Sequence, residues 1–251
     1  MFKSYSAYLL CLVLPLIVGC GAYIYVPIRP PVPLLTQKGE LNLSGGVHFP
    51  DAFGFDFQAA YAFADHWSAV GTIQGGKGKG MPCSQCLDNK FYSLTFGEFG
   101  LGHFGAIGNW DHETYLLGGF GSGTSREEAY PHDFNYSGSS FRLGLQQNIG
   151  IQSETGTIAF GLGAGYERFF ALETNDPEFK INNYYDTLAT LPADTRPISS
   201  FYVEPIFFWS VGSKYVKWTN AIWWSIRSDQ RANEELGFVN LSTSISINLG
   251  L

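Results

Sequence analysis

One stretch of eleven residues, from Phe53 to Phe63, limits the possible folds of this chain more than any other. Its even positions hold Gly, Asp, Gln and Ala, while its odd positions are all apolar: Phe53, Phe55, Phe57, Ala59, Tyr61 and Phe63. Strict alternation of this kind indicates a β-strand with two unlike faces. A tilted strand needs about 9–11 residues to cross a bilayer, so the stretch has the length of a membrane-spanning strand.

Nine further segments repeat this rhythm, and they fill the rest of the chain from residue 40 onward. They lie near residues 40–48, 67–76, 90–107, 112–123, 141–151, 158–167, 198–211, 214–228 and 239–249. We therefore predict an all-β fold, a transmembrane antiparallel up-and-down β-barrel over residues 40–251. Ten strands fit the pattern best, and eight strands remain an alternative.

The lengths of the connections support a barrel of the outer-membrane type. Short connections near 64–67, 108–112, 152–156 and 211–214 alternate with long ones near 77–90, 124–137, 171–197 and 228–237. Short periplasmic turns and longer outer loops alternate in the same way in bacterial barrels. The short connection at 49–52 departs from this rule. An even number of strands places both ends of the barrel on the periplasmic side.

The two faces of the strands differ in a way that favours lipid outside. The polar face is mostly Gly, Ala, Ser, Asn and Gln, which suit the narrow lumen of a small barrel. A soluble ligand-carrying barrel would instead need an outer face rich in Lys and Glu, yet charged residues make up only 15% of this chain. The bulky face is therefore expected to contact acyl chains.

Three local features refine this prediction. The apolar phase slips within 90–107, which predicts a β-bulge near Gly97-Glu98. Pro205 removes one ladder donor from its strand. Tryptophans near the short turns are expected to form an interfacial girdle, and these are Trp67, Trp110, Trp209 and Trp218.

Residues 1–19 have the features of a signal peptide, with Lys3 followed by an apolar segment too short to span a membrane. The sequence Leu-Ile-Val-Gly-Cys at 16–20 resembles the lipobox of bacterial lipoproteins, and this implies cleavage before Cys20 and acylation of Cys20. An ordinary signal peptide is the alternative. The prolines of residues 20–39 exclude a helix and predict a stiff, extended periplasmic tether, which would hold the lipid in the inner leaflet.

Cys83 and Cys86 form a single C-x-x-C motif in a polar connection. Two thiols are too few for a structural zinc site, and no βαβ pattern surrounds them as in a redox motif. In an oxidising compartment they suggest a loop disulfide, with surface metal capture as the alternative. The chain offers no other reason to expect a metal or a cofactor.

Seven charged residues fall on the inward phase of the predicted strands: Asp56, Glu98, Arg142, Glu167, Glu204, Lys217 and Arg227. Both signs are present, and burying such groups without partners would be costly. We therefore expect a network of ion pairs in the lumen. A path for protons or ions is the alternative.

The run Pro33-Leu-Leu-Thr-Gln-Lys-Gly-Glu40, together with Asp56-Phe-Gln-Ala-Ala-Tyr-Ala62, resembles exported outer-membrane β-barrel proteins of the Bacteroidota. The similarity is clearest over about 16–66. It implies an outer-membrane location and a barrel fold, in a family of uncharacterised accessory barrels. It supplies no catalytic residues.

These features favour a non-enzymatic barrel that interacts with outer-membrane lipids and binds a larger outer-membrane complex, or a surface ligand, through its outer loops. An outer-membrane protease or lipid-modifying enzyme is an alternative, with His132-Asp133 or His48 with Asp51 as loop candidates, although no G-x-S-x-G motif is present. A narrow pore is less consistent with ten strands. The net charge of −7 argues against nucleic acid as a partner.

Overall fold

The computed structural model describes residues 28–49, 54–79, 89–129, 132–174, 198–228 and 239–250. Its strands are β1 (Glu40–Phe49), β2 (Gly54–Ala64), β3 (Trp67–Lys79), β4 (Asn89–Ile107), β5 (Trp110–Ala129), β6 (His132–Gln152), β7 (Gly156–Thr174), β8 (Ile198–Gly212), β9 (Val216–Trp224), β10 (Ile226–Arg227) and β11 (Val239–Gly250). Within these ranges, no helix has the length and apolar character needed to cross a membrane.

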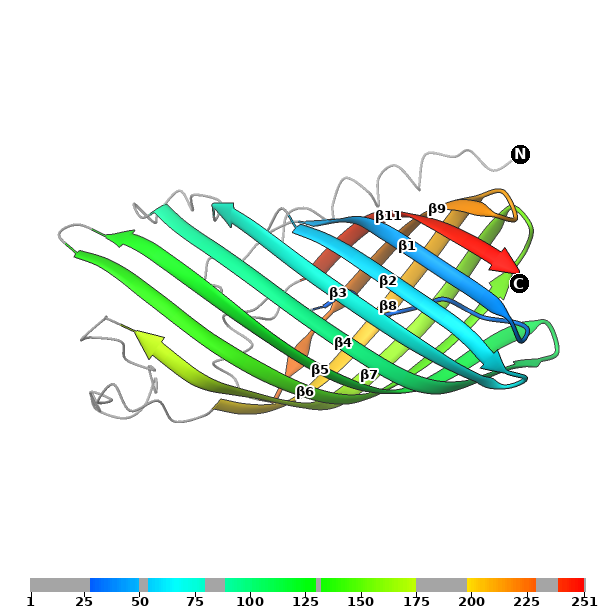
Figure 1. Ribbon diagram of the computed structural model, residues 1–251, viewed down its shortest axis with the longest axis horizontal. Helices are drawn as coiled ribbons and strands as arrows, with labels where there is room; N and C mark the ends of the chain where they lie inside the picture. The colour runs from blue at the N-terminus through cyan, green and yellow to red at the C-terminus, as the bar shows by residue number, and fades with distance from the viewer. Residues whose placement is uncertain are drawn as a thin grey trace, which may run out of the picture.

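The strands form one sheet that closes on itself (Figure 1). Neighbouring strands pair in chain order from β1 to β9, and β11 joins β9 to β1. Ile206 of β8 pairs with Trp223 of β9, and further along Val203 pairs with Ile226 of β10 in the same register. β9 and β10 are therefore two parts of one strand. The prediction of a ten-strand antiparallel barrel is confirmed, and the eight-strand alternative is excluded.

The break between β9 and β10 has a simple cause. It lies opposite Pro205, whose nitrogen carries no hydrogen and cannot donate to the ladder. On its other side, Pro205 still lies within the continuous pairing of β8 with β7, opposite Leu162. The loss of one donor therefore interrupts a single seam of the barrel and leaves its closure intact.

Side chains alternate between the outer surface and the lumen along every strand. In β2, Phe57 is 48% exposed and the next residue, Gln58, is 7% exposed. In β11, Ile245 is 60% exposed, while Ser244 is 4% exposed. The exposed set is dominated by Phe, Leu, Ile, Val and Trp, which is the pattern of a barrel surrounded by lipid. The small polar side chains face inward, as the sequence predicts.

The four tight turns that the structure describes lie at one end of the barrel, which we call the short-turn end. They are residues 65–66, 108–109, 153–155 and 213–215. Glu40 pairs with Gly250 at the same end, so the wall of the barrel begins and finishes there. The opposite end is called the long-loop end (Figure 1). Four outward-facing tryptophans lie close to the tight turns: Trp67, Trp110, Trp209 and Trp218.

The predicted bulge near residues 97–98 is wrong. β4 keeps an unbroken register with both β3 and β5 through this region. Leu94 and Phe96 instead point into the lumen, where both are buried. Room for the Phe96 ring comes from Gly119 and Gly121 on β5, because a Cβ atom at either glycine would overlap that ring. The apolar pattern slips because these side chains fill the lumen, and the strand itself is regular.

Candidate functional site

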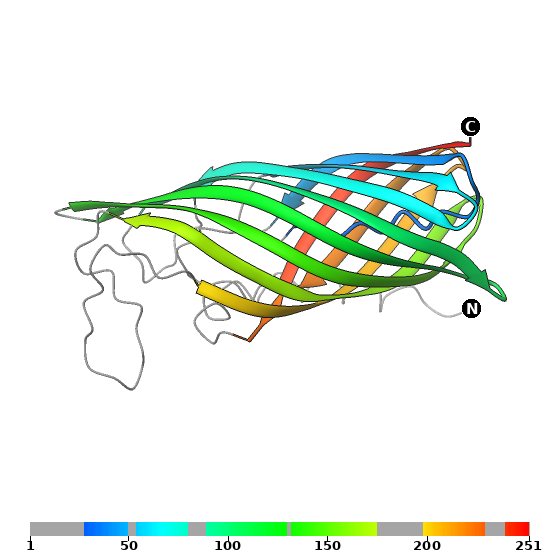
Figure 2. The same ribbon diagram turned by 60° about the horizontal axis from the view of Figure 1, so that its bottom comes forward.

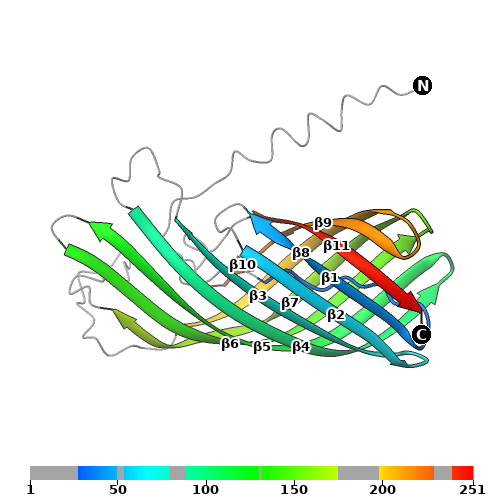
Figure 3. The same cartoon turned by 45° about the horizontal axis from the view of Figure 1, so that its top comes forward.

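The lumen contains a stretch of the chain itself, residues 28–36, which we call the plug (Figures 1 and 3). The plug is extended, in agreement with its prolines, and it belongs to neither a helix nor a strand. Its place differs from the predicted periplasmic tether, because this part of residues 20–39 lies inside the barrel. Ile28, Val32, Leu34 and Leu35 are all buried there.

Amide side chains of the barrel wall satisfy the backbone of the plug. The carbonyl of Pro31 accepts hydrogen bonds from Gln146 at 2.6 Å and from Asn148 at 3.0 Å. The carbonyl of Leu34 accepts one from Gln152, and the carbonyl of Arg29 accepts one from Gln58. A proline-rich segment cannot pair its own carbonyls in a helix, so it needs outside donors when it is buried. The lumenal amides supply them.

Two backbone N–H groups of the plug, one near each end, also have partners. The N–H of Arg29 donates to Gln74 at 3.1 Å, and the N–H of Leu35 donates to the Glu113 carboxylate at 2.8 Å. Glu113 is fully buried, and Asn148 and Tyr115 also donate to it. This carboxylate therefore fixes the plug near the short-turn end.

Arg29 provides the electrostatic anchor of the plug. Its Nη1 atom lies 2.7 Å from Oδ1 of Asp56, and the same nitrogen lies 3.4 Å from the Ser44 hydroxyl. Its Nη2 atom donates to Thr219 at 3.4 Å. Both charged side chains are shielded from solvent, so each depends on the other for compensation. Sequence reasoning placed Asp56 in the lumen but missed its partner.

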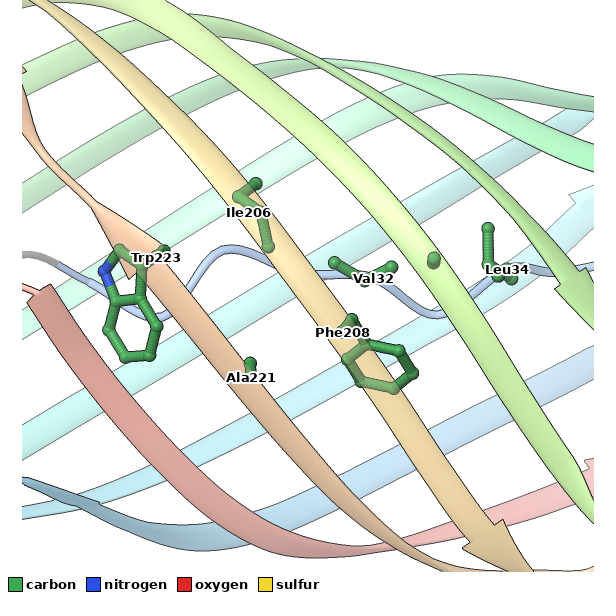
Figure 4. Packing of buried hydrophobic residues seen from close by; sticks show 7 residues of the cluster. Val32, Leu34, Ile206, Phe208, Ala221 and Trp223 are labelled. Atoms are coloured by element: carbon green, nitrogen blue, oxygen red, sulfur yellow. The ribbon is translucent and has the colours of Figure 1, made fainter. Parts of the chain in front are cut away.

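The apolar side chains of the plug pack on two sides of the lumen. Leu35 belongs to a cluster formed with β2 to β5, whose other members are Ala60, Ala62, Val70, Phe104, Tyr115 and Leu117. Val32 and Leu34 belong to a second cluster, with Ala159, Ile206, Phe208, Ala221 and Trp223 (Figure 4). Leu34 has a φ of 49°, a value that a bulky residue keeps only where its surroundings hold it. The plug is therefore a packed part of the interior.

Toward the long-loop end, side chains of the wall cross the lumen. Arg142 of β6 lies 2.5 Å from Glu204 of β8 and 3.4 Å from Glu98 of β4. It also donates to the Tyr202 hydroxyl at 2.9 Å and lies over the Tyr202 ring. Bidentate contact between a guanidinium and a carboxylate is among the strongest pairings in proteins.

A second buried ion pair lies beside the first. Arg227 of β10 is 2.5 Å from Glu167 of β7, and its guanidinium lies near the face of Phe169. The seven charged residues predicted for the lumen thus all face inward. They form separate groups, because Asp56 binds the plug and Lys217 lies near the short-turn end.

Lys217 borders a small polar cavity of about 20 Å³ beside the plug, which has room for a water molecule. Its Nζ atom donates to the carbonyl of Ser153 at 3.2 Å and to the Thr157 hydroxyl at 3.1 Å. Among the residues that the structure describes, no carboxylate forms an ion pair with Lys217. Its ammonium group is held by neutral oxygen atoms.

The remaining predicted residues are the four cysteine and aspartate positions below and three residues of the described strands. Cys20, Cys83, Cys86 and Asp51 lie outside the described residues. His48 faces the lumen, where a ring nitrogen lies 3.5 Å from the Gln74 amide. His132 and Asp133 begin β6, and their backbone pairs with β5.

Outside the lumen, the long-loop end carries a raised part of the sheet. β4, β5, β6 and β7 have 19 to 21 residues each, well beyond the roughly 9–11 that cross a bilayer. Their extra length lies at the long-loop end (Figure 2). We call residues 89–95, 122–129 and 132–139 of β4, β5 and β6 the raised wall. The long loop predicted at 124–137 is therefore strand over most of its length.

The outward side of the raised wall is polar. The change from apolar to polar side chains follows a line of cross-strand partners, Thr95, Ser122 and Ser139. Below this line the outward residues include Phe99, Phe120 and Phe141. Above it they are Ser93, Thr124, Arg126, Asn135 and Ser137, with Phe91 as an apolar exception. This boundary indicates where the sheet leaves the lipid.

No protein-family model matches the chain, and no curated protein matches it. Solved structures with a similar course of the chain include the translocator domain of the autotransporter NalP from Neisseria meningitidis, with 10% identity and a TM-score of 0.49 over 84% of this chain and 87% of that one. Ail, the attachment invasion locus protein of Yersinia pestis, has 9% identity and a TM-score of 0.39 over 85% and 100%. A major outer membrane protein from Thermus thermophilus has 7% identity and a TM-score of 0.41 over 84% and 99%.

Proposed function

We propose that this chain is a non-enzymatic accessory barrel of the bacterial outer membrane, which binds a partner outside the membrane through its raised wall. The observation that carries the proposal is the polar surface above Thr95, Ser122 and Ser139, which stands on strands far longer than the membrane requires. A rigid sheet that projects into water presents side chains for recognition at little cost in ordering. The partner could be a larger outer-membrane complex or a surface ligand.

The filled lumen supports a binding role over a pore. The plug and two sets of ion pairs occupy the interior at successive levels, and a ten-strand barrel is far narrower than the 16–18 strands of porins. We expect no steady ion conductance when the protein is inserted into planar bilayers. Long-lived conductance of the unmodified protein would contradict the proposal.

Acylation at Cys20 is the part of the proposal that rests on sequence alone. The lipobox-like residues 16–20 support it, and the barrel is compatible with an additional lipid anchor. Metabolic labelling with a palmitate analogue should mark the protein, and Cys20→Ala should abolish the label. Unchanged labelling of Cys20→Ala would move the acylation elsewhere.

Most of the β5 and β6 part of the raised wall can be removed without touching the membrane-spanning part. Replacing residues 125–136 by Asn-Gly would join Thr124 to Ser137, which are already cross-strand partners, through a two-residue hairpin. We expect a partner that co-purifies stoichiometrically in mild detergent to be lost, while the barrel still migrates as a folded species on unheated gels. As a matched control, Glu154→Ala changes an exposed residue of a tight turn and should leave partner binding unchanged. Equal recovery with the shortened hairpin would exclude this surface.

A further inference from the structure

The plug has a direction, and this direction says on which side of the membrane the chain begins. Thr36 lies at the short-turn end, where its N–H donates to the Glu40 carboxylate at 2.8 Å. Arg29 lies further along the lumen, bound to Asp56, which is close to the start of β2 at the long-loop end. Going backward along the chain, the backbone therefore runs from the short-turn end toward the long-loop end (Figures 1 and 3).

Among the described residues, the wall of the barrel surrounds the plug closely. Ile28 and Arg29 are 1% and 2% exposed. The wall contacts the plug from many sides, through strands β1, β2, β3, β5, β6, β7, β8 and β9. A chain that turned back at Ile28 toward the short-turn end would have to displace these contacts. The lumen of a barrel of this size is narrow, and the plug and the inward side chains of the wall already occupy this part of it.

We infer that the chain before Ile28 leaves the barrel through its long-loop end, so that the mature amino terminus lies on the exterior of the cell. This inference rests on the outer-membrane location in the proposed function. With acylation at Cys20, the lipid would sit in the outer leaflet, in contrast to the inner leaflet expected from an external tether. Cys20 lies eight positions before Ile28, a stretch that can span up to about 26–29 Å. That reach covers the distance from the middle of a membrane about 30 Å thick to its outer surface.

The side of the amino terminus can be measured directly on intact cells. A short epitope is inserted between Ala22 and Tyr23, and antibody binding is compared before and after permeabilisation of the outer membrane. The same epitope between Asp186 and Thr187, in the connection from β7 to β8, marks the long-loop side. The same epitope after Glu154, in a tight turn, marks the opposite side. We expect the amino-terminal epitope to match the first control, with full binding before permeabilisation. Binding that requires permeabilisation, as for the Glu154 control, would overturn the inference.

A second pair of variants tests whether the route runs through the lumen. Arg29→Glu places two carboxylates against each other at Asp56 and should unseat the plug, so we expect antibody binding on intact cells to fall at least fivefold. The double variant Arg29→Asp/Asp56→Arg restores opposite charges at the same place and should restore most of the binding. Unheated gels establish that each variant still forms a barrel. Binding that is unaffected by Arg29→Glu would show that the amino terminus reaches the exterior by another path, and would overturn the lumenal route.

These outcomes are separate from those that test the proposed function. Loss of the partner on shortening of the raised wall does not depend on the side of the amino terminus. An exposed epitope in a protein without palmitate label would support the exterior amino terminus and reject only the acylation of Cys20. An epitope that is hidden while the partner still binds would reject the topology and leave the raised wall as the binding surface.

Discussion

In the half of the lumen near the short turns, the space is filled by a separate stretch of chain, residues 28–36. In the half near the long loops, it is crossed by side chains of the wall, with Arg142 and Arg227 held by glutamates from other strands. The first closure is a docked segment with its own backbone hydrogen bonds, and the second is part of the barrel itself. Disturbing the first should therefore open the lumen, whereas disturbing the second should destabilise the fold.

The largest effect is expected from Arg142→Ala. This change leaves Glu204 and Glu98 buried without their shared cation, and such losses typically cost about 3–5 kcal/mol of unfolding free energy. Urea unfolding in detergent micelles, followed by tryptophan fluorescence, measures it. The double variant Arg142→Leu/Glu204→Leu should lose less than Arg142→Ala, because one stranded carboxylate is removed as well. A loss below 1 kcal/mol for Arg142→Ala would erase the distinction between the two halves.

Arg29→Ala should destabilise the barrel less and open it more. Loss of the pair with Asp56 should cost about 2–3 kcal/mol, since water can follow a loosened plug to that carboxylate. In planar bilayers we expect brief conducting events that the unmodified protein lacks. Arg29→Lys keeps the charge and should give fewer such events. A variant Arg29→Ala as silent as the unmodified protein would mean that the side chains near the long-loop end close the lumen without the plug.

Gly119→Ala tests, at one position, how tightly the half of the lumen near the long loops is packed. The added Cβ would meet the Phe96 ring, and overpacking of this kind should cost about 1–2 kcal/mol in the same urea experiment. Gly118→Ala is the matched control, because its Cβ would lie 3.6 Å from Leu143 on the outer face. Equal stabilities of the two variants would contradict tight packing in the half of the lumen near the long loops.

The smallest effect is expected from Lys217→Met, in the half of the lumen near the short turns. The ammonium group donates only to neutral oxygens of Ser153 and Thr157 among the described residues, so its removal should cost about 1 kcal/mol. The same unfolding measurement gives the value. A loss of unfolding free energy comparable to that of Arg142→Ala would show that buried charge contributes as much to stability near the short turns as near the long loops.

The wall of the barrel could be predicted because lipid imposes a strict alternation on the strands that cross it. Phe55, Phe57 and Ile245 are exposed to the outside as their alternation requires. Where the sheet rises into water this constraint ends, and residues 124–137, which lack alternation, were expected to form a loop. The structure shows strand over 124–129 and 132–137, because pairing of backbone groups does not depend on apolar side chains.

The plug could not be predicted from its own residues, which indicate only an extended chain. Its position depends on partners far away in sequence, such as Gln146 and Asn148, which are 115 and 117 residues from Pro31. A signal existed in the charges of the inward phase. Four carboxylates faced three cations there, an excess of negative charge that pointed to a further cation, and Arg29 supplies one. Glu113, also missed, lies in a stretch with weak polar contrast.

The pairing of β1 with β11 has a consequence for how the molecule is made. These are the first and last strands to be synthesised, and their ten paired positions form the seam that completes the cylinder. Three residues separate the plug from β1, so it is joined to one side of this seam. A plug that lies inside the barrel before β1 and β11 pair is enclosed when these two strands pair.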